Sequence, residues 1–451
     1  MKARQRASLA SAAAVVALLV SAGDVSAGGG SAVGVSAGDG SAGGAPGEGA
    51  HVEGGTATHA ATDSPTRPDR TAPALPEPSG DRPVGLTTLH LKDEDRADPW
   101  VPGERRELMV SLWYPVRKPS GTPAPYMTAA ESQRYVTANR IPVPPTALSE
   151  VTTHATVGAR PAPAPGGLPL VVLSPGFGMP RATLTGLAEE LAGRGYVVAA
   201  VGHTYEADGI SFPDGRTTSC VACADRDYPK VGAVRAEDVT FVLDELTGRA
   251  APDTPGRTSS KDRTPALPWK GGPRIDTRRV AMVGHSAGGF STIPAMLRDT
   301  RIKAAVNMDG NYHYPNDTPV DRPLLMLGRP SHVPGGADRT WDETWTELTG
   351  WKRWLTVDGI EHNSLTDLAP LAGQFDIPLQ DLDGDRSDAI VRAYVTAFLD
   401  THLRGRETPL LDGPSARYPE VRFHAPRGLD RGGPVGARSR SAGAGSGGRA
   451  G

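Results

Sequence analysis

The stretch Val280–Phe290 reads VAMVGHSAGGF and says most about the fold class. Four apolar residues, typical of a strand buried on both faces, run into the pattern Gly-x-Ser-x-Gly. Helical spacing follows over Ala287–Arg298. A nucleophilic serine stands on a sharp turn between a strand and a helix, where the residues two before and two after it must be small. The stretch therefore predicts that Ser286 is a nucleophile, the alternative being an ordinary glycine-rich turn.

Strands and helices are expected to alternate on both sides of this stretch. The expected strands are Arg106–Val116, Leu168–Leu173, Tyr196–Val201, Val280–Val283, Ile302–Met308, Pro323–Leu327 and Lys352–Val357. Helical spacing also occurs from Leu184 to Leu191 and over Val231–Leu246 and Asp388–Leu403. This alternation predicts an α/β fold, with a doubly wound, mostly parallel sheet and helices on both of its faces.

A serine nucleophile needs a base, and the base needs a carboxylate that fixes its tautomer. Asp309 follows the strand Ile302–Met308 directly and is backed by Gly310. The next strand, after which such folds usually carry the acid, runs instead into Gly-Arg-Pro-Ser. We therefore predict that Asp309 is the acid. The alternatives are Asp338 as the acid, or a turn aspartate that only caps the strand end.

His362 is the expected base. It lies in the polar loop DGIEHNSLTD, directly after the last predicted strand, and the chain order serine, acid, histidine is the one this fold class uses. His203 is expected to line the site or to cap a loop, and His285 to pack away from the serine. The sequence offers no supporting context for His313, His332, His402 or His424.

The negative charge that develops on a substrate carbonyl needs hydrogen-bond donors. One expected donor is the backbone N–H of Ala287, the residue after the nucleophile. The loop Ser174–Gly178 (SPGFG) follows a buried strand, and its glycines let the backbone approach a substrate. We predict the N–H of Phe177 as the second donor.

With these motifs the chain resembles the platelet-activating-factor acetylhydrolase branch of the α/β-hydrolases, over roughly residues 106–403. The resemblance rests on SPGFG with the later GYVVAAVGH, on GHSAGG, on NMDG and on IEHNSLTDL. It implies a serine ester hydrolase that forms an acyl-enzyme on Ser286 and cleaves short or oxidised acyl esters of phospholipids without calcium. No metal or other cofactor is expected. The alternatives are a general carboxylesterase, lipase or polyester hydrolase with the same triad, and a non-catalytic scaffold that binds a ligand or partner.

Charge and composition exclude other classes of protein. Lys and Arg number 48 against 51 Asp and Glu, a balance that lacks the excess of basic residues nucleic-acid binding needs. Two cysteines cannot form a disulfide framework or a four-cysteine metal site. No apolar run approaches the ~20 residues that cross a bilayer. The expected partner is a small-molecule ester or a phospholipid.

The amino-terminal segment is typical of an export signal. Basic residues precede the apolar stretch Leu9–Val20, and small residues follow it up to Ala27. We predict a signal peptide over residues 1–27, cleaved after Ala27 or alternatively after Ala22, and hence a secreted, extracellular protein.

Composition also marks the packed domain. All the Phe, Trp and Tyr residues lie between Trp100 and Phe423, and before that window the sequence from Gly28 to about Gly80 is rich first in Gly, Ala and Ser and then in Pro and Thr. Residues 28–80 are predicted to be a disordered leader and residues 426–451 a disordered Arg/Gly/Ser tail. The catalytic domain is expected over residues 81–425.

In an exported protein, the pair Cys220 and Cys223 is expected to form a short structural disulfide. The alternatives are a redox motif and two free thiols.

Two other features remain open to two readings. Four tryptophans between Trp341 and Trp354 form either an apolar rim for an acyl chain or a transient lipid-surface contact, or part of the core. Asp381–Asp385 resembles half a calcium loop, but it lacks the glycine and the closing glutamate, so a solvated loop is expected.

Overall fold

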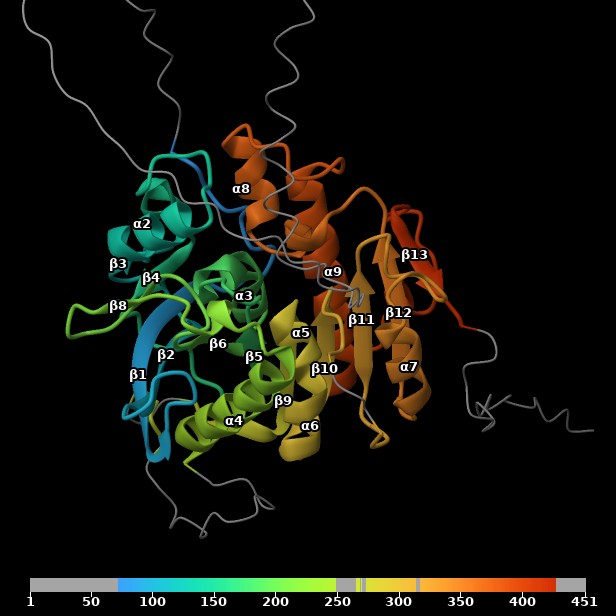
Figure 1. Cartoon of the computed structure of the whole chain (residues 1–451), viewed down its shortest axis with the longest axis horizontal. Helices are drawn as coiled ribbons and strands as arrows, with labels where there is room; N and C mark the ends of the chain where they lie inside the picture. The colour runs from blue at the N-terminus through green and yellow to red at the C-terminus, as the bar shows by residue number, and fades with distance from the viewer. Residues whose placement is uncertain (1–71, 249–264, 268, 270–272, 314–316, 427–451) are drawn as a thin grey trace, which may run out of the picture. The chain divides into compact units, whose positions relative to one another are not determined.

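The computed structural model describes residues 72–248, 265–267, 269, 273–313 and 317–426 (Figure 1). The predicted signal peptide, leader residues 28–71 and tail residues 427–451 lie outside the described residues.

The described strands form one large sheet and a separate small hairpin. The large sheet has the order β13-β12-β11-β10-β9-β5-β6-β2-β1-β4-β3, which Figure 1 shows from β13 at the right to β1 at the left. Its strands are β1 (Val84–Ala97), β2 (Arg105–Pro115), β3 (Thr122–Pro123), β4 (Ala155–Val157), β5 (Leu168–Ser174), β6 (Val197–His203), β9 (Ile275–His285), β10 (Ile302–Met308), β11 (Leu324–Gly328), β12 (Lys352–Val357) and β13 (Val421–His424). The hairpin pairs β7 (Ile210–Ser211) with β8 (Thr217–Thr218).

The centre of the sheet, from β6 to β12, is parallel, whereas β2 and β13 join it antiparallel. Parallel strands are buried on both faces, and β5 and β6 have no exposed residue. The predicted fold class, a doubly wound and mostly parallel α/β sheet, is confirmed.

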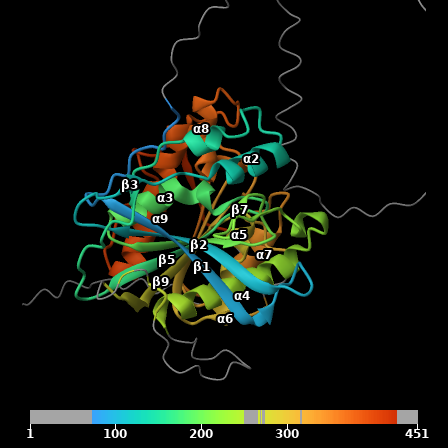
Figure 2. The same cartoon turned by 90° about the vertical axis from the view of Figure 1, so that its left-hand side faces the viewer.

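Helices cover both faces of the sheet, as Figure 2 shows with the sheet seen from its side. One core cluster packs α4 (Tyr228–Thr247), α6 (Thr292–Arg298) and α7 (Thr340–Glu347) against the sheet. The opposite cluster contains α3 (Thr185–Gly193) and α9 (Gly384–Arg404). The remaining α-helices among the described residues are α2 (Ala129–Ala138), α5 (Ala287–Phe290) and α8 (Leu368–Gln374). None of the described helices is both long and apolar enough to span a membrane.

The folded domain begins before residue 81, where the sequence analysis placed its start. Leu75 is 2% exposed, and its N–H donates to the Thr152 carbonyl. The Arg392 guanidinium donates to the carbonyls of Pro76 and Glu77. Residues 73–80 are therefore part of the domain, because buried side chains hold a segment that composition alone marked as leader.

The tryptophans belong to the core. Trp341 and Trp354 are fully buried and Trp345 is 6% exposed, so of the two readings core packing holds for these three and the lipid-facing rim does not. Asp383 caps α9 by accepting the Arg386 N–H, and this explains the acidic run that resembled half a calcium loop.

Candidate active site

The turn at Ser286 is strained and closely packed. Ser286 has φ +52°, a conformation that non-glycine residues rarely adopt. A Cβ on Gly284 would lie 2.1 Å from the Gly288 backbone, and a Cβ on Gly288 would lie 1.9 Å from the Ser174 carbonyl oxygen. Both positions therefore require glycine, and this is why the motif Gly-x-Ser-x-Gly turns here.

Neighbouring strands bring the acid to the serine. Met308 at the end of β10 pairs with His285 at the end of β9, and the Ser286 N–H donates to the Met308 carbonyl. Asp309 follows with φ +60° and is fully buried. The Asn307 side chain holds this turn through Gly310, accepting its N–H and donating to its carbonyl.

The three predicted triad residues meet in one hydrogen-bonded chain. The His362 Nε2 lies 2.9 Å from the Ser286 Oγ, and its Nδ1 lies 2.6 Å from the Asp309 Oδ2. This geometry fits a tautomer in which Nδ1–H donates to the carboxylate and Nε2 accepts the serine proton. Asp338, the alternative acid, does not contact His362; it lies 3.2 Å from the His332 Nε2.

Charge and burial oppose each other at Asp309. Burial alone would raise the pKa of this carboxyl, but His332 and His362 hold the pKa well below its usual range. Asp309 is therefore an anion at neutral pH, as an acid that stabilises a histidine cation must be.

His285 packs directly behind the base. It is fully buried, its ring centroid lies 4.8 Å from that of His362, and its Nε2 lies 2.8 Å from the His362 carbonyl oxygen. Burial lowers the pKa of His285 to about 3, so the ring is neutral and its Nε2–H donates to that carbonyl. His285 thus packs away from the serine, and it also fixes the backbone of the base.

The predicted oxyanion loop leaves β5 beside the turn at Ser286. Ser174 at the end of β5 pairs with Gly284, so Phe177 and Ser286 extend from adjacent strands at the same edge. Ala287 is the first residue of α5, where N–H groups have no partner within the helix. That the N–H groups of Phe177 and Ala287 bind an oxyanion stays a prediction.

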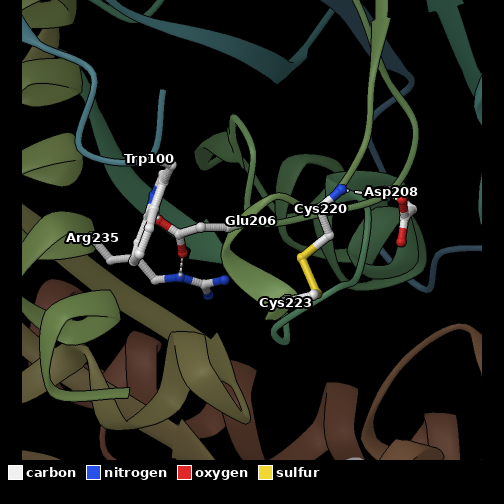
Figure 3. Close-up of a disulfide and its surroundings, with 6 residues drawn as sticks. All are labelled: Trp100, Glu206, Asp208, Cys220, Cys223 and Arg235. Carbon is white, nitrogen blue, oxygen red and sulfur yellow. Dashed lines mark hydrogen bonds and ion pairs between the residues drawn. A yellow bond between two sulfur atoms is a disulfide. The ribbon is translucent and has the colours of Figure 1, made fainter. Parts of the chain in front are cut away.

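A buried ionic network supports this loop, and Figure 3 shows its residues Trp100, Glu206 and Arg235. Arg235 donates to the Pro175 carbonyl at 2.5 Å and pairs with Glu206 at 2.7 Å. Trp100 also donates to Glu206, whose own carbonyl accepts the Gly178 N–H. The loop is thus fixed at both of its ends.

His203 belongs to the same buried network. It is 1% exposed and connects Ser174 to Asp238, which Arg106 also holds. It therefore supports the end of β5 and does not line the site.

Cys220 and Cys223 form a disulfide, drawn in Figure 3, that lies beside the predicted oxyanion loop. The Cys220 N–H donates to Asp208, and the Asp208 N–H donates to the Gly178 carbonyl. A Cβ on Gly178 would meet the Cys223 Sγ at 3.8 Å. The disulfide thus closes a short turn that packs against Gly178, next to Phe177.

His332 is the residue of this site that the sequence analysis missed. It donates through Nδ1 to the Asp309 Oδ1 at 2.7 Å, on the side of the carboxylate away from His362. The only available signal was its place in the loop after β11, where this fold class usually carries the acid.

A serine on a strained strand-to-helix turn, with a histidine and an aspartate from later strand ends of a doubly wound sheet, defines an α/β-hydrolase. Comparisons with known proteins specify the branch. The family model "Platelet-activating factor acetylhydrolase, isoform II" matches residues 102–214. A probable 1-alkyl-2-acetylglycerophosphocholine esterase of Arthroderma benhamiae is 26% identical, over 77% of this chain and 93% of its own length. A platelet-activating factor acetylhydrolase of Gallus gallus is 24% identical, over 52% of this chain and 62% of its own.

Among solved structures, a ferulic acid esterase from Streptomyces cinnamoneus is 43% identical, with a TM-score of 0.67. The match covers 79% of this chain and all of the other. The chain belongs to the platelet-activating-factor acetylhydrolase-like branch of the α/β-hydrolases, and it is an ester hydrolase. The alternative of a non-catalytic scaffold is therefore wrong.

Proposed function

We propose that this chain cleaves short-chain acyl esters, including phospholipids with a short acyl group, through an acyl-enzyme on Ser286. The observation that carries the proposal is the hydrogen-bonded chain from Ser286 through His362 to the buried Asp309. The names of the relatives in Arthroderma benhamiae and Gallus gallus support the phospholipid substrate. We also propose that the protein acts outside the cell, because residues 1–27 have the pattern of an export signal.

The reaction proceeds in two halves. The Ser286 Oγ attacks the ester carbonyl while His362 Nε2 takes its proton, and Asp309 stabilises the resulting imidazolium. The N–H groups of Phe177 and Ala287 hold the oxyanion. His362 then gives the proton to the leaving alcohol. A water molecule, deprotonated by His362, cleaves the acyl-enzyme and releases Ser286.

A second candidate substrate is an ester of an aromatic acid. Four rings from four separate segments gather next to the turn at Ser286: Phe177, Tyr228, Phe290 and His313. Tyr228 stacks on His313 with centroids 4.4 Å apart, and the Phe290 N–H donates to the Ser286 carbonyl. Such rings suit a flat aryl group, and the similar Streptomyces cinnamoneus structure is named a ferulic acid esterase.

A substrate panel tests both candidates. We would compare wild type with Ser286→Ala on p-nitrophenyl acetate, butyrate and octanoate, on 2-acetyl phosphatidylcholine and on methyl ferulate. Serine-dependent cleavage of acetate and the acetyl phospholipid supports the first candidate. A preference for methyl ferulate supports the second candidate, provided that Tyr228→Ala reduces the cleavage of methyl ferulate more than the cleavage of p-nitrophenyl acetate. A preference for p-nitrophenyl octanoate, without cleavage of the acetyl phospholipid or of methyl ferulate, would indicate a lipase or polyester hydrolase.

A further inference from the structure

Asp309 is held by two histidines from opposite sides. Its Oδ2 accepts the His362 Nδ1–H at 2.6 Å, and its Oδ1 accepts the His332 Nδ1–H at 2.7 Å. The Arg329 N–H also donates to Oδ1, at 2.7 Å. His332 is 2% exposed, so this second contact is as well shielded from water as the carboxylate itself.

Both ring nitrogens of His332 face acceptors. Nδ1 faces Asp309, and Nε2 lies 3.0 Å from the Asn311 Oδ1 and 3.2 Å from the Asp338 Oδ2. A neutral imidazole has only one N–H, so one of its nitrogens would present a lone pair to a carboxylate or amide oxygen. This geometry fits the doubly protonated, positively charged ring.

The surroundings are shaped for this ring. Gly328 leaves the space it needs, because a Cβ there would lie 3.0 Å from the Asp309 Oδ1 and 3.1 Å from the His332 Nδ1. The indole of Trp341 stacks on the ring at 4.5 Å with an angle of 2° between the planes. The Trp354 Nε1–H donates to the His332 carbonyl at 2.8 Å. A cation against an indole face is itself favourable.

We propose that His332 is a positioning residue of the catalytic site, a buried cation that holds the Asp309 carboxylate toward His362 and weakens the negative charge His362 senses. The inference rests on the proposed function of Ser286, His362 and Asp309. The pKa of His332, which is raised to about 9, agrees with the proposal. Burial alone would lower this pKa, but Asp309 and Asp338 raise it by more than burial lowers it.

The consequence is that the Asp309 carboxylate attracts a positive charge on His362 less strongly. The charged groups that face His332 are Asp309 from the end of β10, Asp338 before α7, and the Arg329 side chain, whose Nε lies 3.5 Å from the Asp309 Oδ2. His362 lies across the carboxylate. When the positive charge of His332 is removed, the negative charge of Asp309 acts more strongly on His362 and stabilises its protonated form. A protonated His362 cannot act as a base.

The test uses His332→Asn, which keeps an N–H near the position of Nδ1 but has no charge, and His332→Leu, which has neither. We expect the acidic limb of log kcat/KM for p-nitrophenyl acetate to move to higher pH by about one unit in His332→Asn. Activity at pH 6 should then fall about tenfold, while the plateau at higher pH and KM change little. His332→Leu should in addition lose kcat at every pH.

His402→Asn is the matched control, because His402 is a half-buried histidine that packs on Trp351 and Phe398. It should leave the acidic limb in place. An acidic limb of His332→Asn that coincides with that of wild type would overturn the proposal.

A measurement on the wild type covers the case in which the variants do not fold. Nitrogen-15 spectra of histidine-labelled protein should show one ring that keeps both protons above pH 8 and whose signals shift in Asp338→Asn. A spectrum in which every ring is neutral by pH 8 contradicts the proposal. Wild-type activity of Ser286→Ala would instead refute the proposed function, a result that these spectra do not depend on.

Discussion

Asp309 is the residue on which the charges of the site converge. It is fully buried in a left-handed conformation and accepts hydrogen bonds from two histidines and a backbone N–H. Asp309→Asn should lower kcat about 10⁴-fold, because an amide cannot hold the His362 tautomer or stabilise its cation. The control is Asp358→Asn, an exposed carboxylate in the loop before His362 that pairs with Arg422. Equal losses in both variants, measured with p-nitrophenyl acetate, would argue against a role for Asp309 in the reaction.

Burial of His285 makes the stability of the folded chain depend on pH. Its pKa is lowered to about 3 in the folded chain, against about 6.5 when unfolded. Between pH 6.5 and 3 the unfolded chain therefore binds a proton at this ring, whereas the folded chain does not. The contribution of His285 to the free energy of unfolding is complete above pH 6.5 and is lost as the pH falls toward 3. Between pH 6.5 and 4.5, wild type should lose up to about 3 kcal/mol more unfolding free energy than His285→Gln. Parallel urea-denaturation curves for the two proteins would contradict this.

At the scale of elements, the turn between β9 and α5 depends on its glycines. Gly288→Ala should unfold the protein or destabilise it by more than about 3 kcal/mol, because the new methyl group would overlap the Ser174 carbonyl and the backbone must move. Gly373→Ala in α8 is the matched control, since its Cβ meets nothing within 4 Å. That variant should be neutral or slightly more stable. Similar melting temperatures for the two variants would refute the packing argument.

The disulfide turn should stabilise the neighbouring loop. Replacing both Cys220 and Cys223 by serine should cost about 2 kcal/mol of stability, since the bond closes a very short loop. The same double replacement should lower kcat by a larger factor than it changes KM, because the turn packs against Gly178 next to Phe177. Thermal denaturation and kinetics with and without dithiothreitol measure both effects. Insensitivity of the wild type to reductant, with full reduction shown by thiol titration, would contradict the prediction.

The elements that the sequence predicted best are the buried parallel strands. The continuous apolar run Leu168–Leu173 predicted β5 to within one residue, since such runs occur where both faces of a strand are covered, and β10 and β12 have the bounds that were expected. The long β1 was missed because its second half, KDEDRA, is charged and mostly exposed. The site followed a similar division. Ser286, Asp309 and His362 have local motifs, whereas the role of His332 depends on a contact with Asp309 that no local pattern encodes.

At the scale of the whole molecule, the folded domain starts earlier than composition suggests. Pro, Ala and Glu over residues 73–80 look like leader, but Leu75 enters a cluster with Tyr126, Tyr135 and Leu371. Local composition could not reveal this, because the partners lie far away in the chain.

This assignment predicts the effect of truncating one side chain. Leu75→Ala should cost about 2–4 kcal/mol of stability, the usual cost of a cavity in a core. Glu77→Ala in the same segment, whose side chain is exposed, should cost less than about 0.5 kcal/mol. Equal melting temperatures for wild type and Leu75→Ala would show that the segment does not belong to the folded domain.

The most direct test of Ser286 as the nucleophile is labelling with a fluorophosphonate, which phosphonylates an activated serine with loss of fluoride. Mass spectrometry of the digested protein should place the label on the peptide that carries Ser286. Labelling should be strongly slowed in Asp309→Asn and in His362→Ala, and it should be absent from Ser286→Ala and from denatured wild type. Label on another residue, or a native wild type that does not react, would contradict the assignment of Ser286 as the nucleophile.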